Sequence, residues 1–267
     1  MKKSGKNAPV EKNTAKNNKL KVKEENTVIR KKAPKWFYIA AYLIPVIFII
    51  VLEVSLRLAN YGDDYTQWID AGQGKYMLNR DIGKKYFFSE GFVPSVSEDY
   101  FDIEKKQNSF RVFVLGGSSA EGYPFSPPGS FSRYIRKRLE LTYPNTPVEV
   151  VNIAMTGVNS YTMLDFLPGV IEQKPDLVLI YAGHNEYYGA LGVGSVQSFG
   201  SSRTVIRLML FLNEFKTTQL IRNFIKWVVK STSSSEKDFT GTLMSKMPED
   251  KNILLDYEVY NEGIEQF

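Results

Sequence analysis

A serine that follows two glycines is the first feature of the sequence that could do chemistry. Ser118 lies in the run Gly116-Gly117-Ser118-Ser119, directly after an apolar segment. The glycines allow the backbone to turn tightly and leave its N–H groups accessible. A serine at the tip of such a turn can present its hydroxyl and a backbone donor at one point. Because a hydroxyl is a weak nucleophile, it also needs an adjacent base.

Other interpretations of this glycine turn fit the residues less well. It is not a Walker A phosphate loop, because no Gly-Lys-Ser/Thr follows it. It is not a Gly-x-Ser-x-Gly nucleophile elbow either, because position 120 is Ala120. An ordinary tight turn remains an alternative, since a glycine pair after a strand is not specific by itself.

Two later loops hold residues that could complete an oxyanion site around Ser118. Gly157 can offer an unobstructed backbone N–H, and Asn185 offers a side-chain NH₂ group. With the N–H of Ser118 these groups make three donors around one point. Such an arrangement suits the negative charge that develops on the carbonyl oxygen during ester cleavage.

His184 is the single histidine of the sequence. His184 precedes Asn185 directly, and the side chains of neighbouring residues in an extended turn point in different directions. We therefore favour a structural role, or one at the rim of the site, for His184 over the role of general base. A metal role is weaker again, because no carboxylates stand at ligand spacing from it. The sequence has no cysteine, which excludes thiolate metal sites and disulfides. We expect no cofactor and no metal.

The candidate residues need a scaffold that brings their loops together. Three apolar runs predict buried strands, and two segments with helical spacing predict the helices between them. In chain order these segments are 111–115, 130–143, 148–153, 161–173 and 177–181. Alternating strands and helices at this spacing predict an α/β domain with a parallel sheet and covering helices. Ligands bind at the carboxyl ends of such strands, where Ser118, Gly157 and Asn185 follow.

Three segments of the chain resemble the sequence blocks of the SGNH/GDSL hydrolases, and residues 60–110 and 187–195 further resemble the membrane-anchored bacterial members of that family. Residues 113–122, FVLGGSSAEG, resemble the first block, and residues 151–157, VNIAMTG, resemble the second. Residues 183–186, GHNE, resemble the third block, Gly-x-Asn-Asp. The blocks occur in order, each after a predicted strand, and the resemblance spans about residues 110–190.

This resemblance implies a serine esterase with a three-layer, flavodoxin-like parallel-sheet fold. Ser118 would be the catalytic nucleophile, and Gly157 and Asn185 would form the oxyanion hole. Two positions depart from the family's pattern. Gly117 stands where many members have Asp, and Glu186 stands where the third block ends in Asp, which would alter a supporting hydrogen bond.

The fifth block of the family, Asp-x-x-His, supplies the base and the residue that orients it, and no histidine follows His184. We therefore expect the chain to be an N-terminal fragment that is inactive by itself, with a domain incomplete at the C-terminus. The full-length protein would be an ester hydrolase. Two alternatives stay open: a non-catalytic membrane scaffold or interaction protein that retains the fold, and an O-acyltransferase of envelope glycans.

The first part of the chain differs in charge from the rest. Residues 1–35 hold twelve of the 34 basic residues and three of the 29 acidic ones, so the remainder carries 22 basic and 26 acidic residues. We predict a disordered basic tail, which cannot bury enough apolar surface to fold. The mildly acidic body argues against nucleic-acid binding.

An apolar stretch follows the basic tail. Residues 36–52 carry no charge, and a helix over 36–58 would be roughly 34 Å long, enough to cross a bilayer. The basic residues before it predict a cytoplasmic N-terminus and a periplasmic main domain. A cleaved signal peptide is the alternative, but its charged leader would be too long and Arg57-Leu58-Ala59 is a poor cleavage site.

Four parts of the chain are expected: the tail 1–35, the transmembrane helix 36–58, an irregular connector 60–109 that packs on the main domain, and the hydrolase-like domain 110–267. Within the last, residues 204–230 predict one helix with basic residues. We favour an insertion packed on the sheet, and an interfacial helix on the bilayer is the alternative. The expected partners are the membrane and an acylated glycan or lipid substrate, and no oligomeric state can be predicted.

Overall fold

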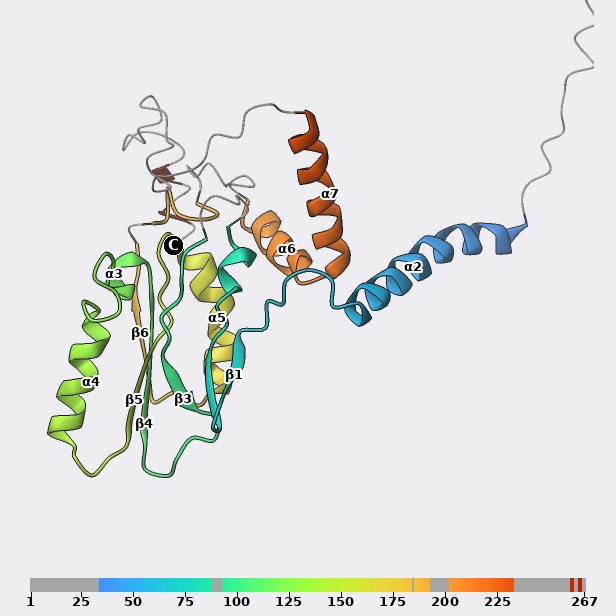
Figure 1. Cartoon of the computed structure of the whole chain (residues 1–267). Coiled ribbons are helices and arrows are strands. Elements are labelled where there is room, and N and C mark those ends of the chain that lie inside the picture. Colours follow the sequence, from blue (N-terminus) through green and yellow to red (C-terminus); the bar gives the residue numbers. More distant parts are fainter. Residues whose placement is uncertain are drawn as a thin grey trace, which may run out of the picture. The chain divides into compact units, whose positions relative to one another are not determined.

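The structure is a computed structural model of the 267-residue chain, and it describes residues 34–87, 93–183, 185–192, 202–232, 260–261 and 264–265. The chain divides into two compact units, residues 1–51 and 52–267. Figure 1 gives the labels of the helices and strands.

Helix α2, Lys35–Leu58, contains the apolar stretch. It has 24 residues, and its most apolar window has a mean hydropathy of 2.5. None of its residues is buried. The predicted helix over 36–58 is therefore confirmed, and it is long and apolar enough to cross a bilayer. The tail predicted over 1–35 lies almost entirely outside the described residues.

The second unit contains a three-stranded parallel sheet in the order β5-β4-β6. These strands are β4 (Phe110–Gly116), β5 (Val148–Asn152) and β6 (Leu177–Tyr181). The central strand β4 pairs in parallel with both neighbours, so all three carboxyl ends lie at one edge of the sheet. This sheet confirms the predicted mixed α/β fold with parallel strands.

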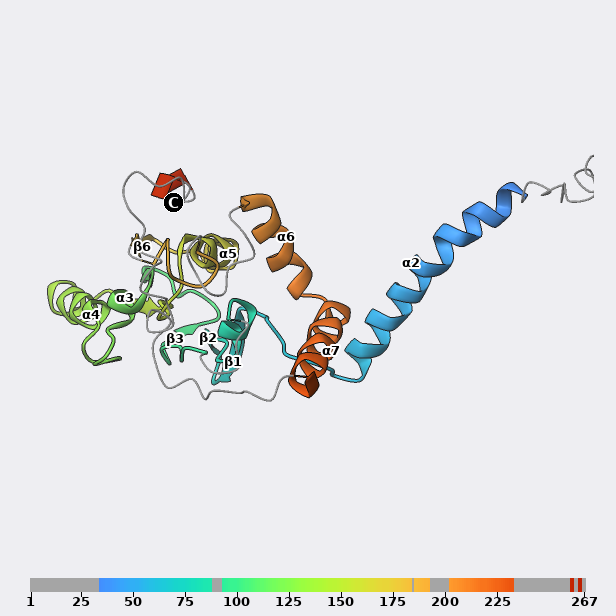
Figure 2. The same cartoon turned by 90° about the horizontal axis from the view of Figure 1, so that it is seen from above.

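Two helices cover the sheet on opposite faces, α4 (Phe131–Thr142) on one and α5 (Ser160–Glu172) on the other (Figures 1 and 2). Alternate side chains of a strand point to opposite faces. On β4, Val112 and Val114 join the α4 cluster, whereas Phe113 joins the α5 cluster. Burial on both faces explains the apolar run of the central strand β4, whereas the edge strand β6 is partly exposed.

The segment expected as an irregular connector forms a second, antiparallel sheet. Its strands are β1 (Trp68–Gly72), β2 (Lys75–Leu78) and β3 (Tyr100–Asp102). The 3₁₀ helix η1 (Ile82–Lys85) lies between β2 and β3 in the sequence. The ring of Phe101 lies 5.0 Å from that of Trp68 and 5.2 Å from that of Phe113, both edge to face. These aromatic contacts join the small sheet to the α5 face of the large one.

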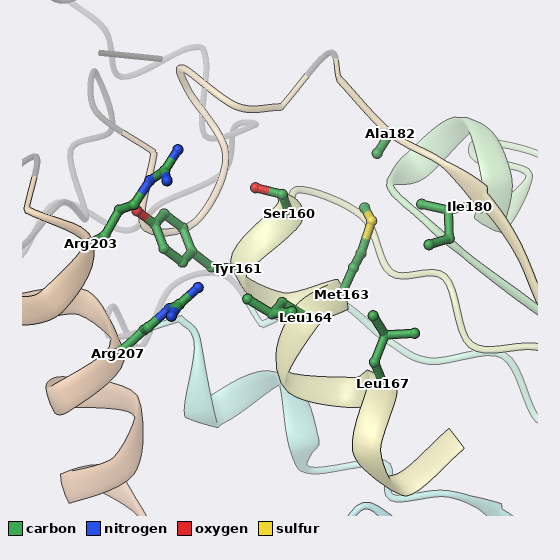
Figure 3. A pocket seen from close by; sticks show the side chains of 9 residues that line it. All are labelled: Ser160, Tyr161, Met163, Leu164, Leu167, Ile180, Ala182, Arg203 and Arg207. Atoms are coloured by element: carbon green, nitrogen blue, oxygen red, sulfur yellow. The ribbon is translucent and has the colours of Figure 1, made fainter. Parts of the chain in front are cut away.

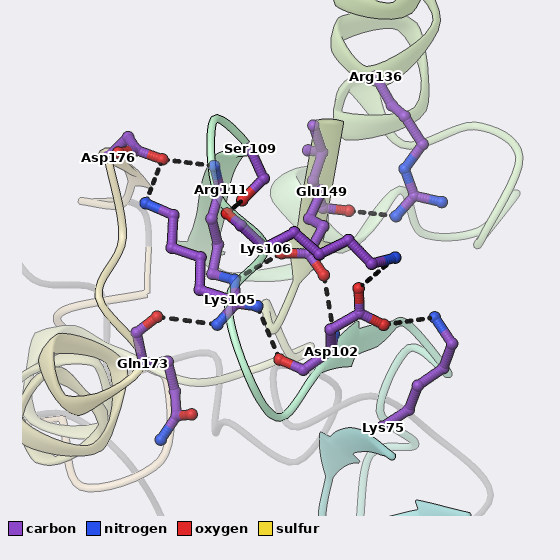
Figure 4. A network of polar contacts seen from close by, with 11 residues as sticks. Lys75, Asp102, Lys105, Lys106, Ser109, Arg111, Arg136, Glu149, Gln173 and Asp176 are labelled. Carbon is purple, nitrogen blue, oxygen red and sulfur yellow. Dashed lines mark hydrogen bonds and ion pairs between the residues drawn. The ribbon is translucent and has the colours of Figure 1, made fainter. Parts of the chain in front are cut away.

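A buried arginine joins the two sheets at the end opposite the strand carboxyl ends (Figure 4). Arg111 is 1 % exposed, and its guanidinium donates to Glu149 Oε2 at 2.6 Å, to the carbonyl of Gln173 at 2.9 Å and to that of Asp102 at 2.7 Å. It also lies over the ring of Phe101. A guanidinium is satisfied by such a planar set of acceptors. Arg111 therefore connects β3, β4, β5 and α5.

The single helix predicted over 204–230 is wrong, because the structure has two, α6 (Arg203–Asn213) and α7 (Lys216–Thr232). The break has a tertiary cause. The carboxylate of Glu53 accepts hydrogen bonds from the backbone N–H groups of Lys216 at 3.1 Å and Thr217 at 2.8 Å. It thus provides the N-terminal cap that lets a new helix begin there.

Candidate active site

Ser118 begins the short helix α3 (Ser118–Glu121), directly after β4 and the two glycines. A side chain at Gly116 would place its Cβ 2.4 Å from the carbonyl oxygen of Tyr181 on the neighbouring strand, so only glycine fits this close approach. The turn predicted from the sequence is therefore present. Ser118 is half-buried, and within the described part of the chain its hydroxyl has no hydrogen-bond partner.

A buried glutamate joins α3 to the loop after β5. Glu121 accepts a 2.5 Å hydrogen bond from the side-chain hydroxyl of Thr156, the neighbour of Gly157. Burial raises the pKa of the Glu121 carboxyl, and the bonds from Thr156 oppose that shift. The N–H of Met155 also donates to the carbonyl of Gly116 at 3.0 Å. The turn of Ser118 and the loop of Gly157 are thereby held together.

Asn152, the last residue of β5, organises the residues behind Ser118. Its buried side-chain amide donates to the carbonyl of Ala120 at 2.9 Å and to the hydroxyl of Ser130 at 2.7 Å. Its amide oxygen accepts from the N–H of Ala154 at 3.0 Å. Ser130 is the N-cap of α4, so this one side chain connects the ends of β5, α3 and α4.

Gly157 follows β5 and adopts a φ of 77°, which favours glycine. Its carbonyl accepts a 2.7 Å hydrogen bond from the N–H of Ala190, in the loop after β6. Gly157 is half-buried. Its positive φ explains why the loop requires a glycine here, independently of any chemistry.

Asn185 lies in the loop after β6 and is 9 % exposed. One N–H of its side-chain amide donates to the carbonyl of Val158 at 2.9 Å. An amide group carries two such donors, so this bond orients the side chain while using one of them. Gly189 allows the loop to close tightly, because a Cβ there would lie 2.5 Å from the carbonyl oxygen of Asn185.

Glu186 holds the start of α5. Its carboxylate accepts from the backbone N–H of Ser160 at 3.1 Å and from the hydroxyl of Ser160 at 2.7 Å, beside the N-cap residue Asn159. A carboxylate at this position satisfies N–H groups that the first helical turn leaves without a partner. Glu186 thus has a supporting hydrogen-bonding role at the start of α5.

The structure therefore places Ser118, Gly157 and Asn185 in three loops at one edge of the sheet, joined to each other by hydrogen bonds. Their chemical roles stay predictions. His184 lies outside the described residues. Among the residues that the structure describes, no cluster of His, Cys, Asp or Glu could hold a metal ion.

Sequence reasoning did not identify the residues that position these loops. Glu121, Asn152 and Thr156 contact partners that are distant in the sequence, and none of them stands in a pattern that marks such contacts. Glu186 and Ser160 form a pair across two loops for the same reason. The sequence resemblance drew attention to Glu186 but could not indicate its partner.

A pocket of about 360 Å³ lies between α5, α6 and the end of β6 (Figure 3). It is lined mainly by apolar side chains, with two arginines on the α6 side: Ser160, Tyr161, Met163, Leu164, Leu167, Ile180, Ala182, Arg203 and Arg207. Burial raises the pKa of Tyr161, and the charges of Arg203 and Arg207 oppose the shift. Ser160 connects this pocket to the loop of Asn185 through Glu186.

Comparisons with known proteins do not identify a family. No protein-family model matches the chain, and no curated protein matches it.

Proposed function

We propose that the chain carries the nucleophile and the oxyanion hole of a membrane-anchored serine esterase of the SGNH/GDSL type. The main support is the joining of three loops at the carboxyl edge of a parallel sheet. The bond between Glu121 and Thr156 fixes Ser118 to the loop of Gly157, and the bond from Asn185 to Val158 fixes the third loop to the same place. The three-layer arrangement around the parallel sheet is consistent with that family.

In this proposal Ser118 Oγ attacks the carbonyl carbon of an ester while a base accepts its proton. The carbonyl oxygen becomes negatively charged and accepts hydrogen bonds from the N–H groups of Ser118 and Gly157 and from Asn185. The C–O bond to the alcohol then breaks as the base returns the proton to the alcohol oxygen, and water that gives a proton to the same base hydrolyses the acyl-serine. One preorganised donor of this kind contributes about 10²–10³ in rate.

The proposed family takes its base from an Asp-x-x-His block, and this sequence contains none. We propose that the chain by itself acylates Ser118 slowly and turns over little ester. Robust ester hydrolysis by the chain alone, lost in Ser118→Ala, would contradict this part of the proposal.

The proposed location is the outer side of the cytoplasmic membrane. Helix α2 is long and apolar enough to be the anchor, and the basic residues before it favour a cytoplasmic N-terminus. The main domain would then meet acylated glycans or lipids of the cell envelope, which are the substrates that we propose.

The test is covalent labelling of the detergent-solubilised chain with a fluorophosphonate, which reacts with activated serines. Imidazole added in increasing concentration would substitute for the missing base. We expect labelling that rises with imidazole and maps to Ser118 by peptide mass spectrometry. Ser118→Ala should abolish it, and the matched variant Ser119→Ala should retain it.

Equal labelling of the chain and of Ser118→Ala would reject the proposed nucleophile. It would favour the second candidate, a scaffold that keeps the fold without the reaction, for which the single histidine is the supporting observation. An O-acyltransferase would label like the esterase, and it would be recognised by transfer of the acyl group to a sugar hydroxyl instead of water.

A further inference from the structure

Helix α7 exposes an apolar stripe. Ile221, Phe224 and Ile225 are 55 %, 60 % and 55 % exposed, and Val228 continues the same spacing. Residues at i, i+3, i+4 and i+7 lie on one face of a helix. Trp227 is also exposed and stacks on Phe224, with 5.9 Å between the ring centroids.

The opposite side of α7 contacts the protein through polar groups. Gln219 is 1 % exposed and accepts a 2.9 Å hydrogen bond from the N–H of Asp63. Lys216 Nζ donates to the carbonyl of Asp63 at 2.6 Å, and Arg222 donates to the hydroxyl of Tyr65 at 3.0 Å. A surface helix in water normally turns its apolar face inward. In α7 the polar face is inward and the apolar face is outward.

The position of α7 indicates what covers the outer face. Its first two N–H groups are hydrogen-bonded to Glu53, the residue that follows the uncharged run ending at Leu52. Arg57 in turn donates to Glu53 at 2.7 Å and to the carbonyl of Glu214, just before α7. Helix α7 therefore begins beside the last turns of α2, directly after the uncharged run of that helix.

We propose that α7 lies in the interface of the membrane that α2 crosses, with the stripe of Ile221, Phe224 and Ile225 inserted among the lipid acyl chains. Its length of 17 residues suits a helix that lies along the bilayer surface. Trp227 is of the type enriched at the interface. In the neighbouring helix α6, Leu208 and Phe211 are also exposed. The inference rests on the proposed anchoring by α2.

The absence of cysteine makes a direct test available, because a single introduced cysteine can carry a nitroxide without background. The full chain would be reconstituted in vesicles of phosphatidylcholine and phosphatidylglycerol with the label at Phe224→Cys. The matched control is Tyr134→Cys on α4, an aromatic residue with 70 % exposure. A third label at Ile47→Cys in α2 reports on the anchor itself.

Collisions of each nitroxide with oxygen, which concentrates in lipid, and with a water-soluble nickel chelate measure its depth. We expect the ratio of oxygen to nickel collisions at position 224 to exceed that at position 134 several-fold, and to approach that at position 47. Nickel access at position 224 as high as at position 134, with position 47 in lipid, would overturn the inference and leave the anchor intact.

Two other outcomes would also overturn it. If position 47 is open to nickel, the proposed anchoring fails, and the placement of α7 fails with it. If the label at position 224 is immobilised and inaccessible to both reagents, a protein surface covers the stripe instead of lipid.

Discussion

The hydroxyl of Thr156 donates a 2.5 Å hydrogen bond to the carboxylate of Glu121 and so joins the helix that begins at Ser118 to the loop of Gly157. In Thr156→Val the carboxylate loses this side-chain donor while the side-chain volume is kept. We expect the free energy of unfolding to fall by about 1–3 kcal/mol, and labelling of Ser118 to slow. Thr142→Val, at an exposed position of α4, is the control for the loss of a threonine hydroxyl. If the midpoint of denaturant unfolding were unchanged in both variants, the bond between Thr156 and Glu121 would make no contribution to stability.

The same carboxyl gives a prediction about pH. Burial raises the folded-state pKa of Glu121 above its ordinary value of 4.5, so ionisation costs more in the folded chain than in the unfolded one. The folded state therefore loses stability as pH rises above that ordinary pKa. Glu121→Gln does not ionise, and its amide oxygen can still accept the bond from Thr156. We expect the stability of this variant relative to the unmodified chain to increase between about pH 4 and about pH 7. A difference that is constant across this range, or that falls, would contradict the raised pKa.

Asn185→Ala tests the proposed oxyanion hole. The substitution removes a donor that would stabilise the developing charge, so imidazole-assisted labelling of Ser118 should slow by about 10²–10³. Because Asn185 also donates to Val158, thermal unfolding must be measured in parallel to separate loss of the donor from loss of the loop. Asn145→Ala, in the exposed loop after α4, should label at the original rate. If Asn185→Ala were stable and were labelled as fast as the control, the proposed role of Asn185 as an oxyanion donor would be rejected.

Arg111→Ala should be among the most destabilising changes in the second unit. It leaves Glu149 without its buried cationic partner and two backbone carbonyls without donors. We expect a loss of about 3–5 kcal/mol in the free energy of unfolding, as for other broken buried ion pairs. Lys75→Ala breaks a partly exposed ion pair with Asp102 and should cost less than about 1 kcal/mol. If urea unfolding gave similar losses in the free energy of unfolding for both variants, burial of the ion pair would not determine its contribution to stability.

Glu53→Ala should loosen the first turn of α7. The N–H groups of Lys216 and Thr217 lose their acceptor, which for an N-terminal cap costs about 1 kcal/mol. Hydrogen exchange measured by mass spectrometry should therefore accelerate in peptides covering the start of α7. Exchange in β4 should not change. The control Glu140→Ala removes an exposed carboxylate from α4 and should leave the exchange of α7 as it was.

Much of the large sheet could be predicted from the sequence, because each of its strands contains a short apolar run followed by turn-forming residues. The strand expected at 177–181 has the same bounds in the structure, and those of β4 and β5 differ by one or two residues. The antiparallel sheet of β1, β2 and β3 was missed. Its strands have only three to five residues, and pairing between distant segments stabilises them more than local propensity does.

The break between α6 and α7 could not be predicted for a related reason. The residues on both sides favour helix, and the cap that starts α7 comes from Glu53, far away in the sequence. In the candidate site, the types of Ser118, Gly157 and Asn185 were conspicuous, since they suit a nucleophile and oxyanion donors. The groups that hold them, such as Asn152 and Glu121, become evident only when their partners are placed in space.

The capping of α7 by Glu53 also means that the last turns of α2 belong structurally with the second unit. A substitute apolar helix of the same length would hold the chain in a bilayer and yet leave α7 uncapped, unless it supplied a carboxylate at the same place. A protease that cut after Leu58 would release a body that lacks both Glu53 and Arg57. Any soluble version of this protein should therefore retain the last turns of α2 and replace only the residues before Glu53.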